Sequence, residues 1–250
     1  MRQDQRRFAL YALTHGLNTA TVAALSARQM GLDEAAVKTL VRAALVMNAP
    51  IVELQAQMAE QSDPPSKRQL DLIRTHPTRA AEWLRAAGVD DPAWLEAVQD
   101  HHERDGGSGY PRGLGQVGEL ARLLRAADVY TAKISPRAVR APLNSQTAAH
   151  QLLQEMPGSP VGAALVKAVG VYPPGDFVRL KSGETAVVVR RTGEVRAPEV
   201  VVLLSATGRP PSEPRRRDTR DPAFAIAGIA PRDGLPARIL PEQVYGLLDG

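Results

Sequence analysis

The chain has 250 residues, of which 44% are hydrophobic, with a formal charge of +4 and no cysteine. This length allows one sizeable domain and a smaller appendage, and the lack of cysteine excludes disulfides and thiolate metal sites. We find no apolar run of the length that a membrane span needs and few aromatic side chains that could stack on bases. We therefore expect a cytoplasmic protein without a membrane or a nucleic acid as partner.

The first two thirds of the chain carry the apolar periodicity and the capping residues that predict helices. Asp33 is a predicted N-cap, and Pro50 is expected to end the helix that follows. The predicted helical segments, in chain order, are 8–30, 33–49, 52–58, 77–88 (opened by Pro77 and closed by Gly88), a segment opened by Pro92, 117–133, and a pair over 145–170.

After Tyr172 the pattern changes to valine-rich segments separated by Ser-Gly and Thr-Gly turns, which predict a small β-meander. Its expected strands are 177–180, 185–191 and 199–205. Prolines and arginines follow Gly208 and predict a solvated linker with a tail of weak periodicity. We therefore expect a helical domain over 1–170, a β extension over 171–208, and a linker and tail over 209–250.

The strongest local motif is His101-His102-Glu103, which a glycine-rich loop follows. Val98 lies three and four residues before the two histidines, so both imidazoles fall near the apolar face of the predicted helix. Buried imidazoles need polar partners, and a metal ion is a partner that suits them. Each histidine taken singly fits a satisfied core or capping residue, whereas the set taken together favours a metal site.

Three further residues extend this set. Asp128 lies four residues beyond Leu124 on an apolar helix face, where a carboxylate must be paired or bound to a cation. His15 shares a helix face with apolar neighbours, and His76 stands just before Pro77. His150 has no such company, and we expect it to be structural. The candidate metal ligands are His15, His76, His101, His102 and Asp128.

These ordered motifs closely resemble the HD-GYP family over about residues 10 to 170. The shared positions are His15, His76-Pro77, His101-His102-Glu103, Gly109-Tyr110-Pro111, Asp128, and the arginines of Arg137-Ala138-Val139-Arg140. The resemblance implies a mainly α fold, an HD-superfamily helical bundle, here with a small C-terminal β-rich extension. It also implies a fold built for metal-dependent hydrolysis of cyclic di-GMP.

The sequence departs from the family at the residues that give the family its name. Met47, Asn48 and Ile51 stand where the family has His, Asp and Lys, and Tyr11 stands where three-metal members have a glutamate. The resemblance implies that the family's Asp bridges two metal ions. A neutral amide supplies no charge for this, and a thioether is too soft for iron, manganese or magnesium. We therefore expect impaired catalysis, with one transition metal ion (zinc, iron or manganese) at partial occupancy or none.

The leading interpretation is a non-hydrolytic module of cyclic di-GMP signalling. Such a module would act as a nucleotide sensor through Arg137 and Arg140, positions that the family implicates in nucleotide binding. It could instead bind a diguanylate cyclase or another signalling protein through an exposed loop formed by Gly109, Tyr110 and Pro111. Two alternatives stay open: an active metal-dependent cyclic di-GMP phosphodiesterase with a reduced ligand set, and a remnant bundle that serves homodimerisation.

Overall fold

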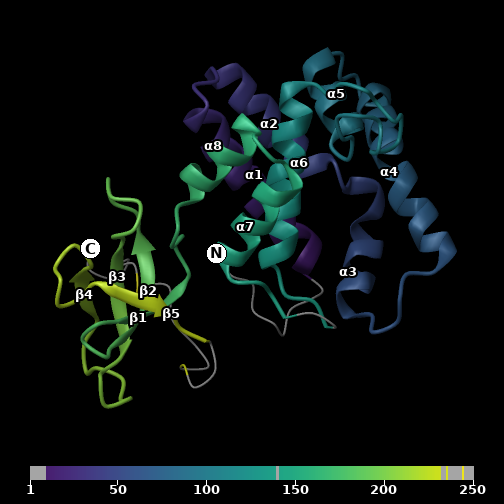
Figure 1. Cartoon of the computed structure of the whole chain (residues 1–250). Helices are drawn as coiled ribbons and strands as arrows, with labels where there is room; N and C mark the ends of the chain where they lie inside the picture. The colour runs from purple at the N-terminus through teal and green to yellow at the C-terminus, as the bar shows by residue number, and fades with distance from the viewer. Residues whose placement is uncertain (1–9, 139–140, 232–234, 236–243, 245–250) are drawn as a thin grey trace. The chain divides into compact units, whose positions relative to one another are not determined.

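The computed structural model describes residues 10–138, 141–231, 235 and 244 (Figure 1). The chain divides into two compact units. The helical unit extends to Leu143 and includes Thr147–Val169, and the β-rich unit comprises Asn144–Gln146 and the chain from Gly170 on. The predicted fold class, a helical bundle with a small C-terminal β extension, is confirmed.

The helices of the bundle begin and end close to the predicted positions. Asp33 accepts a hydrogen bond from the Ala36 amide at 2.8 Å, as its predicted capping role requires. The elements are α1 (Tyr11–Gln29), α2 (Glu34–Val46), the 3-10 turn η2 (Ala49–Ile51), α3 (Val52–Glu60), α4 (Lys67–Ala86), α5 (Pro92–Asp100), α6 (Glu119–Ile134), α7 (Ser145–Glu155) and α8 (Pro160–Val169).

The bundle core forms around α1, which packs against α2, α6 and α8. The leucines at its centre are fully buried, and burying each such side chain stabilises the fold by about 1.5–3 kcal/mol. They are Leu40, Leu123, Leu124, Leu152 and Leu165. The apolar stripes of the sequence are therefore the faces that meet in this core.

One predicted boundary is wrong. Pro77 does not open a helix, because α4 runs without interruption from Lys67 to Ala86 and holds Pro77 in its interior. The helix begins at a capping box in which the Ser66 hydroxyl accepts from the Gln69 amide and the Gln69 side chain accepts from the Ser66 amide. This start signal, at Ser66, lies eleven residues before the proline.

The stretch Glu34–Glu60 is long and apolar enough, by length and composition alone, to cross a membrane. The expectation that no apolar run reaches the length of a membrane span is therefore wrong on this criterion. In the structure the stretch is broken between α2 and η2, and Leu40, Ala43 and Met47 belong to the bundle core. Buried core helices of this composition meet the same criterion.

The β-rich unit is a five-stranded antiparallel sheet with strand order β4-β3-β2-β1-β5. Its strands are β1 (Phe177–Leu180), β2 (Thr185–Arg190), β3 (Glu199–Leu204), β4 (Arg215–Asp218) and β5 (Ile226–Ile229). Val187 and Val201 pair across β2 and β3 and belong to one apolar cluster, while Val188 and Val200 belong to a second. Apolar residues therefore cover both faces, which explains why the central strands read as continuous valine runs.

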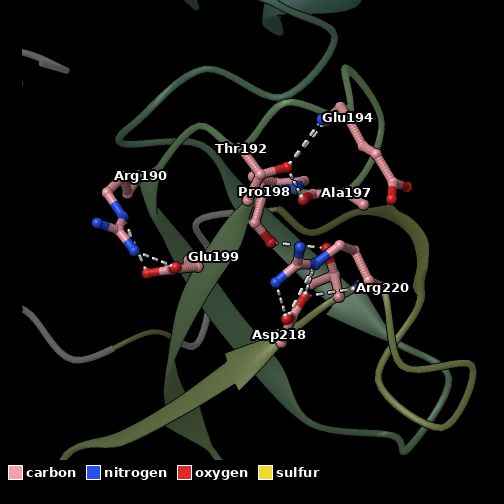
Figure 2. Close-up of polar contacts among 9 residues, drawn as sticks. Arg190, Thr192, Glu194, Ala197, Pro198, Glu199, Asp218 and Arg220 are labelled. Carbon is pink, nitrogen blue, oxygen red and sulfur yellow. Dashed lines mark hydrogen bonds and ion pairs between the residues drawn. The ribbon is translucent and has the colours of Figure 1, made fainter.

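Two of these strands lie where the sequence predicts a linker and a tail, and for β4 and β5 that prediction is wrong. Arginines at three successive positions give no apolar signal, yet they suit an edge strand, where charge discourages pairing with another chain. Arg217 donates to both oxygens of Glu184 at 2.9 and 3.1 Å. At the β2–β3 turn, Arg190 pairs with Glu199, and nearby Arg220 pairs with Asp218 (Figure 2).

Candidate metal centre

A cavity of about 240 Å³ lies inside the helical unit. His15 from α1, His76 from α4, His102 from the turn after α5 and Asp128 from α6 all line it. His101 is fully buried beside them. The five predicted metal ligands, spread over more than a hundred residues of sequence, therefore meet around one cavity, although their role as ligands stays a prediction.

The sequence suggested that the histidines of the His-His-Glu motif lie on a helix. In the structure they follow the end of that helix. Helix α5 ends at Asp100, and His101 is its C-cap residue. The turn lets the ring of His101 reach back to its own helix, where its Nδ1 lies 2.6 Å from the Val98 carbonyl oxygen. This carbonyl is one of the last of the helix and has no amide partner within it.

His76, His101 and His102 form the tightest group, with candidate ligand nitrogens all within 4.8 Å of one another. Nδ1 of His76 lies 2.6 Å from the Ile73 carbonyl oxygen, just as Nδ1 of His101 faces Val98. A carbonyl can only accept, so both rings carry a proton on Nδ1. Burial lowers the pKa of His76 to about 3 and also lowers the pKa values of His101 and His102, which keeps the three rings neutral.

In these neutral tautomers Nε2 of His76 and Nε2 of His101 each present a lone pair, and the two atoms are 3.2 Å apart. With no proton between them the contact is unfavourable, whereas a shared cation makes it favourable. Two nitrogens on one tetrahedral zinc ion, each about 2.0–2.1 Å from it, lie roughly 3.3 Å apart. The residues therefore fit a metal ion held by His76 and His101, with His102 as the third imidazole. Such an ion, when bound, would polarise a phosphoryl oxygen or activate water.

Pro77 explains why His76 has this tautomer. An interior helical residue normally donates its amide to the carbonyl four residues earlier, which for position 77 is Ile73. Proline has no amide hydrogen, so it leaves the Ile73 carbonyl free. Nδ1 of His76 takes that acceptor. The His-Pro pair thus orients an imidazole and does not begin a helix.

His15 and Asp128 form a second, separate pair. Nε2 of His15 lies 2.7 Å from Oδ1 of Asp128, and both residues are buried. Burial raises the pKa of the Asp128 carboxyl, but the hydrogen bond and the charge interaction with His15 lower it by more, so the pKa stays below its ordinary value. Nδ1 of His15 is buried with no hydrogen-bond partner among the described residues. The two candidate ligands here are bonded to each other, and a metal ion would have to displace that bond.

The three substituted positions behave differently. Asn48 lines the cavity. The sequence suggested that this residue lies on the helix, but in the structure it lies in the turn between α2 and η2. Ile51 also lines the cavity and brings an apolar side chain where the resemblance implies a lysine. Met47 is fully buried, packs in the bundle core and is not among the residues that line the cavity.

Glu103 and Asp100 hold the loop that follows the histidines, a role that the sequence analysis missed. The buried Glu103 carboxylate accepts backbone hydrogen bonds from Gly113 at 3.0 Å and Leu114 at 3.1 Å. Asp100 is fully buried and forms a two-point ion pair with Arg112. The acidic residues on either side of the two histidines were the available signal, because carboxylates next to buried imidazoles are expected to have defined partners.

The predicted interaction loop is less exposed than expected, because Gly109, Tyr110 and Pro111 are all half-buried. The Tyr110 ring stacks on His102, with ring centroids 4.7 Å apart, and lines the metal cavity. Gly109 allows this close approach, since a Cβ atom there would lie 2.4 Å from the backbone of Glu103. Tyr110 therefore belongs to the wall of the site.

Arg137 also lines the cavity, and its Nη2 donates to the Tyr11 hydroxyl at 2.9 Å. Tyr11 in turn stacks on His15, with centroids 5.6 Å apart. Of the two predicted nucleotide-binding arginines, Arg137 therefore faces the site, and Arg140 lies outside the described residues. His150 is exposed on α7, away from this group.

The comparisons with known proteins show the family of this chain. The family model described as HD domain matches residues 3–165. The chain is 29% identical over 245 residues to cyclic di-GMP phosphodiesterase PA4108 of Pseudomonas aeruginosa, covering 95% of this chain and 59% of that protein. It is 22% identical over 186 residues to cyclic di-GMP phosphodiesterase PdeB of Borreliella burgdorferi, covering 72% of this chain and 49% of that protein.

Among solved structures, the fold is similar to that of Bd1817, a HDG"Y"P protein from Bdellovibrio bacteriovorus. The TM-score is 0.50 at 22% identity, and the match covers 60% of this chain and 50% of that one. The chain thus spans about half to three fifths of the length of these relatives. Because the family model covers well over half of the chain, the protein belongs to the HD domain family, of which it is an HD-GYP-like member.

Proposed function

We propose that this chain is a cyclic di-GMP sensing module whose hydrolytic activity is impaired. The observation that carries the proposal is Asn48, a neutral amide that lines the cavity at the position where the resemblance implies a metal-bridging carboxylate. The mutual bond of His15 and Asp128 supports it, since it engages the two remaining ligands of one metal position. The names of the two curated relatives support cyclic di-GMP as the ligand.

Binding without hydrolysis has a physical basis in this cavity. Arg137 keeps a permanent positive charge at its wall, and guanidinium groups suit phosphate oxygens and the guanine edge. The volume of about 240 Å³ is smaller than the roughly 300–1,000 Å³ of typical ligand pockets. A cyclic dinucleotide would therefore insert one part into the cavity and rest across its mouth.

The second candidate function is an active, metal-dependent cyclic di-GMP phosphodiesterase with a reduced ligand set. The facing Nε2 atoms of His76 and His101 favour it, because they offer one complete position for a metal ion. His102 supplies a third imidazole at the edge of the cavity. One ion can activate water, but the charge neutralisation that a second ion would give the leaving oxygen is missing.

A titration of the purified protein with cyclic di-GMP by calorimetry tests the sensing proposal. We expect binding to wild type, a loss of at least tenfold in affinity for Arg137→Ala, and unchanged affinity for Arg68→Ala, which removes an exposed arginine of α4. If the wild-type protein does not bind the nucleotide, the sensing proposal is wrong. A protein-interaction module and a dimerising remnant then remain as the alternatives.

Metal analysis and a hydrolysis assay with manganese separate the two candidates. The sensing proposal predicts clearly less than two metal ions per chain and little or no turnover. Any metal that is present should be lost in His76→Ala and retained in His150→Ala, the matched exposed histidine. Two tightly held ions, or turnover in the ordinary enzymatic range of about 1–10³ per second, would favour the phosphodiesterase.

Restoring the missing carboxylate gives an independent check. Asn48→Asp should raise metal affinity, because position 48 lines the cavity. Met47→His should instead lower stability, since it places an imidazole in the apolar core. Equal metal affinity in a folded Asn48→Asp variant would contradict the role assigned to this position.

A further inference from the structure

A second cavity, of about 350 Å³, lies in the helical unit and shares no lining residue with the metal cavity. The loop that follows His102, helix α6 and the turn between α7 and α8 form its walls. Three arginines line it: Arg104 from the loop, and Arg122 and Arg125 from α6. Three guanidinium groups around one hollow repel each other unless anions offset them, and three carboxylates, Glu103, Asp105 and Glu155, line the same cavity.

Arg125 is the most unusual of the three, because it is only 6% exposed. A guanidinium group has five hydrogen-bond donors, yet within the described part of the chain Arg125 makes no hydrogen bond. Its nearest acidic group is the Glu155 carboxylate, at 3.8 Å. Burial, and then the charge of Arg104, lower the pKa of Arg125, but a guanidinium remains charged at neutral pH. A buried cation without hydrogen-bonded partners is costly.

The three carboxylates that line this cavity, Glu103, Asp105 and Glu155, each have a shorter contact with a group other than the three arginines. Glu155 forms its short ion pair with Lys133, at 2.9 Å. Asp105 accepts from the Val117 amide at 2.9 Å and lies 3.5 Å from Nη1 of Arg122. Nε of Arg122 is buried and has no partner among the described residues. Arginines and carboxylates are therefore equal in number around the cavity, but Nε of Arg122 and the guanidinium of Arg125 lack hydrogen-bond acceptors among the described residues.

The N-terminus of α8 adds further hydrogen-bond donors. Ser159, which lines the cavity, immediately precedes the ten-residue helix, and its hydroxyl lies 3.5 Å from the Gly162 amide. The first amides of a helix carry a partial positive charge and commonly bind phosphate groups. Helix terminus and arginines thus lie around the same space.

We propose that this second cavity is a binding site for a terminal phosphate group, held by Arg104, Arg122 and Arg125. Arginine binds phosphate oxygens through paired, charge-assisted hydrogen bonds, which would supply the partners that Arg125 and Arg122 lack. The group can come from free phosphate or from the terminal phosphate of a nucleotide. The proposal does not depend on the function of the metal cavity.

Calorimetric titration of chelator-treated, metal-free protein with inorganic phosphate and with guanosine 5′-monophosphate tests the site. Arg104 is exposed, so Arg104→Ala should fold normally, and we expect it to weaken binding at least tenfold. Arg125→Lys, which keeps the charge but loses the paired donors, should weaken binding as well. Arg68→Ala, an equally exposed arginine on α4, should bind as wild type does.

The two sources of phosphate give different outcomes, and both support the site. Equal affinities indicate free phosphate, and preference for guanosine 5′-monophosphate indicates a nucleotide. Binding of neither probe, or equal binding by wild type and Arg104→Ala, would overturn the proposal. Arg137→Ala should leave binding of inorganic phosphate unchanged, so failure of this site can be distinguished from failure of cyclic di-GMP sensing.

Discussion

Replacing Pro77 with alanine should make the protein more stable and a weaker metal binder at the same time. The substitution restores an amide that can donate to the Ile73 carbonyl, the acceptor that now holds Nδ1 of His76 at 2.6 Å. An interior proline costs a helix about 3 kcal/mol relative to alanine. Two losses reduce this gain. The variant no longer buries two ring methylenes, at about 0.8 kcal/mol each, and its unfolded chain is freer, which costs about 0.4–1 kcal/mol. The net gain should be roughly 0.5–1 kcal/mol.

The metal site should respond in the opposite direction. The restored amide competes for the carbonyl that fixes the His76 tautomer, and losing such a supporting hydrogen bond typically costs about 10–100-fold in metal affinity. Because the Ile73 carbonyl can accept from both the restored amide and His76, we expect metal affinity to fall by about tenfold, the lower end of this range. Urea denaturation measures the stability, and competition with a chromophoric zinc chelator measures the affinity. Nitrogen chemical shifts of the His76 ring report its tautomer even without metal.

Pro92→Ala is the matched control, since Pro92 is the first residue of α5, where the amide would have no helical partner. It should leave stability nearly unchanged and metal affinity unaffected. The reasoning is refuted if Pro77→Ala gains stability while its metal affinity and its His76 tautomer stay as in wild type.

Three further outcomes follow from the described contacts. Glu103→Gln should lower the free energy of unfolding by about 1.5–3 kcal/mol, because hydrogen bonds to a buried charge are lost; denaturant titration checks this. Gly109→Ala should lower the melting temperature, as its Cβ would lie 2.4 Å from backbone atoms, whereas Gly115→Ala, with nothing within 4 Å, should not. The hydrogen bond from Arg217 holds the pKa of Glu184 below its ordinary value of 4.5, so this pair stabilises fully above that pH and is lost as the pH falls through the lowered value. Glu184→Gln should flatten the acid limb of the stability curve, and an unchanged acid limb would contradict the assignment.

Much of the architecture was predictable because its causes are local. Apolar periodicity, the N-cap Asp33 and the helix-opening Pro92 placed most helices within a few residues. Valine runs between glycine turns placed the three central strands. The exceptions were elements whose local signals are weak or misleading. They are α4, in which an interior proline imitates a helix start, and the edge strands β4 and β5, which form because β3 and β1 offer them an edge.

The candidate site shows the same division between local and long-range causes. Residue type and helical spacing singled out His15, His76, His101, His102 and Asp128 as candidate ligands, because histidines and a carboxylate on apolar faces need partners wherever they lie. Which partner each one has could not be predicted. His15 bonds Asp128, 113 positions away, and His76 faces His101, 25 positions away.

The sequence by itself determined the family, the helical class and the set of ionisable residues that the core would have to accommodate. Only the tertiary structure decided that Asn48 faces the cavity while Met47 packs in the core, and that Arg104, Arg122 and Arg125 meet at a second cavity. The physical reason is that periodicity tells which face of an element is buried. Side-chain pairing depends on distances across elements, which packing alone sets.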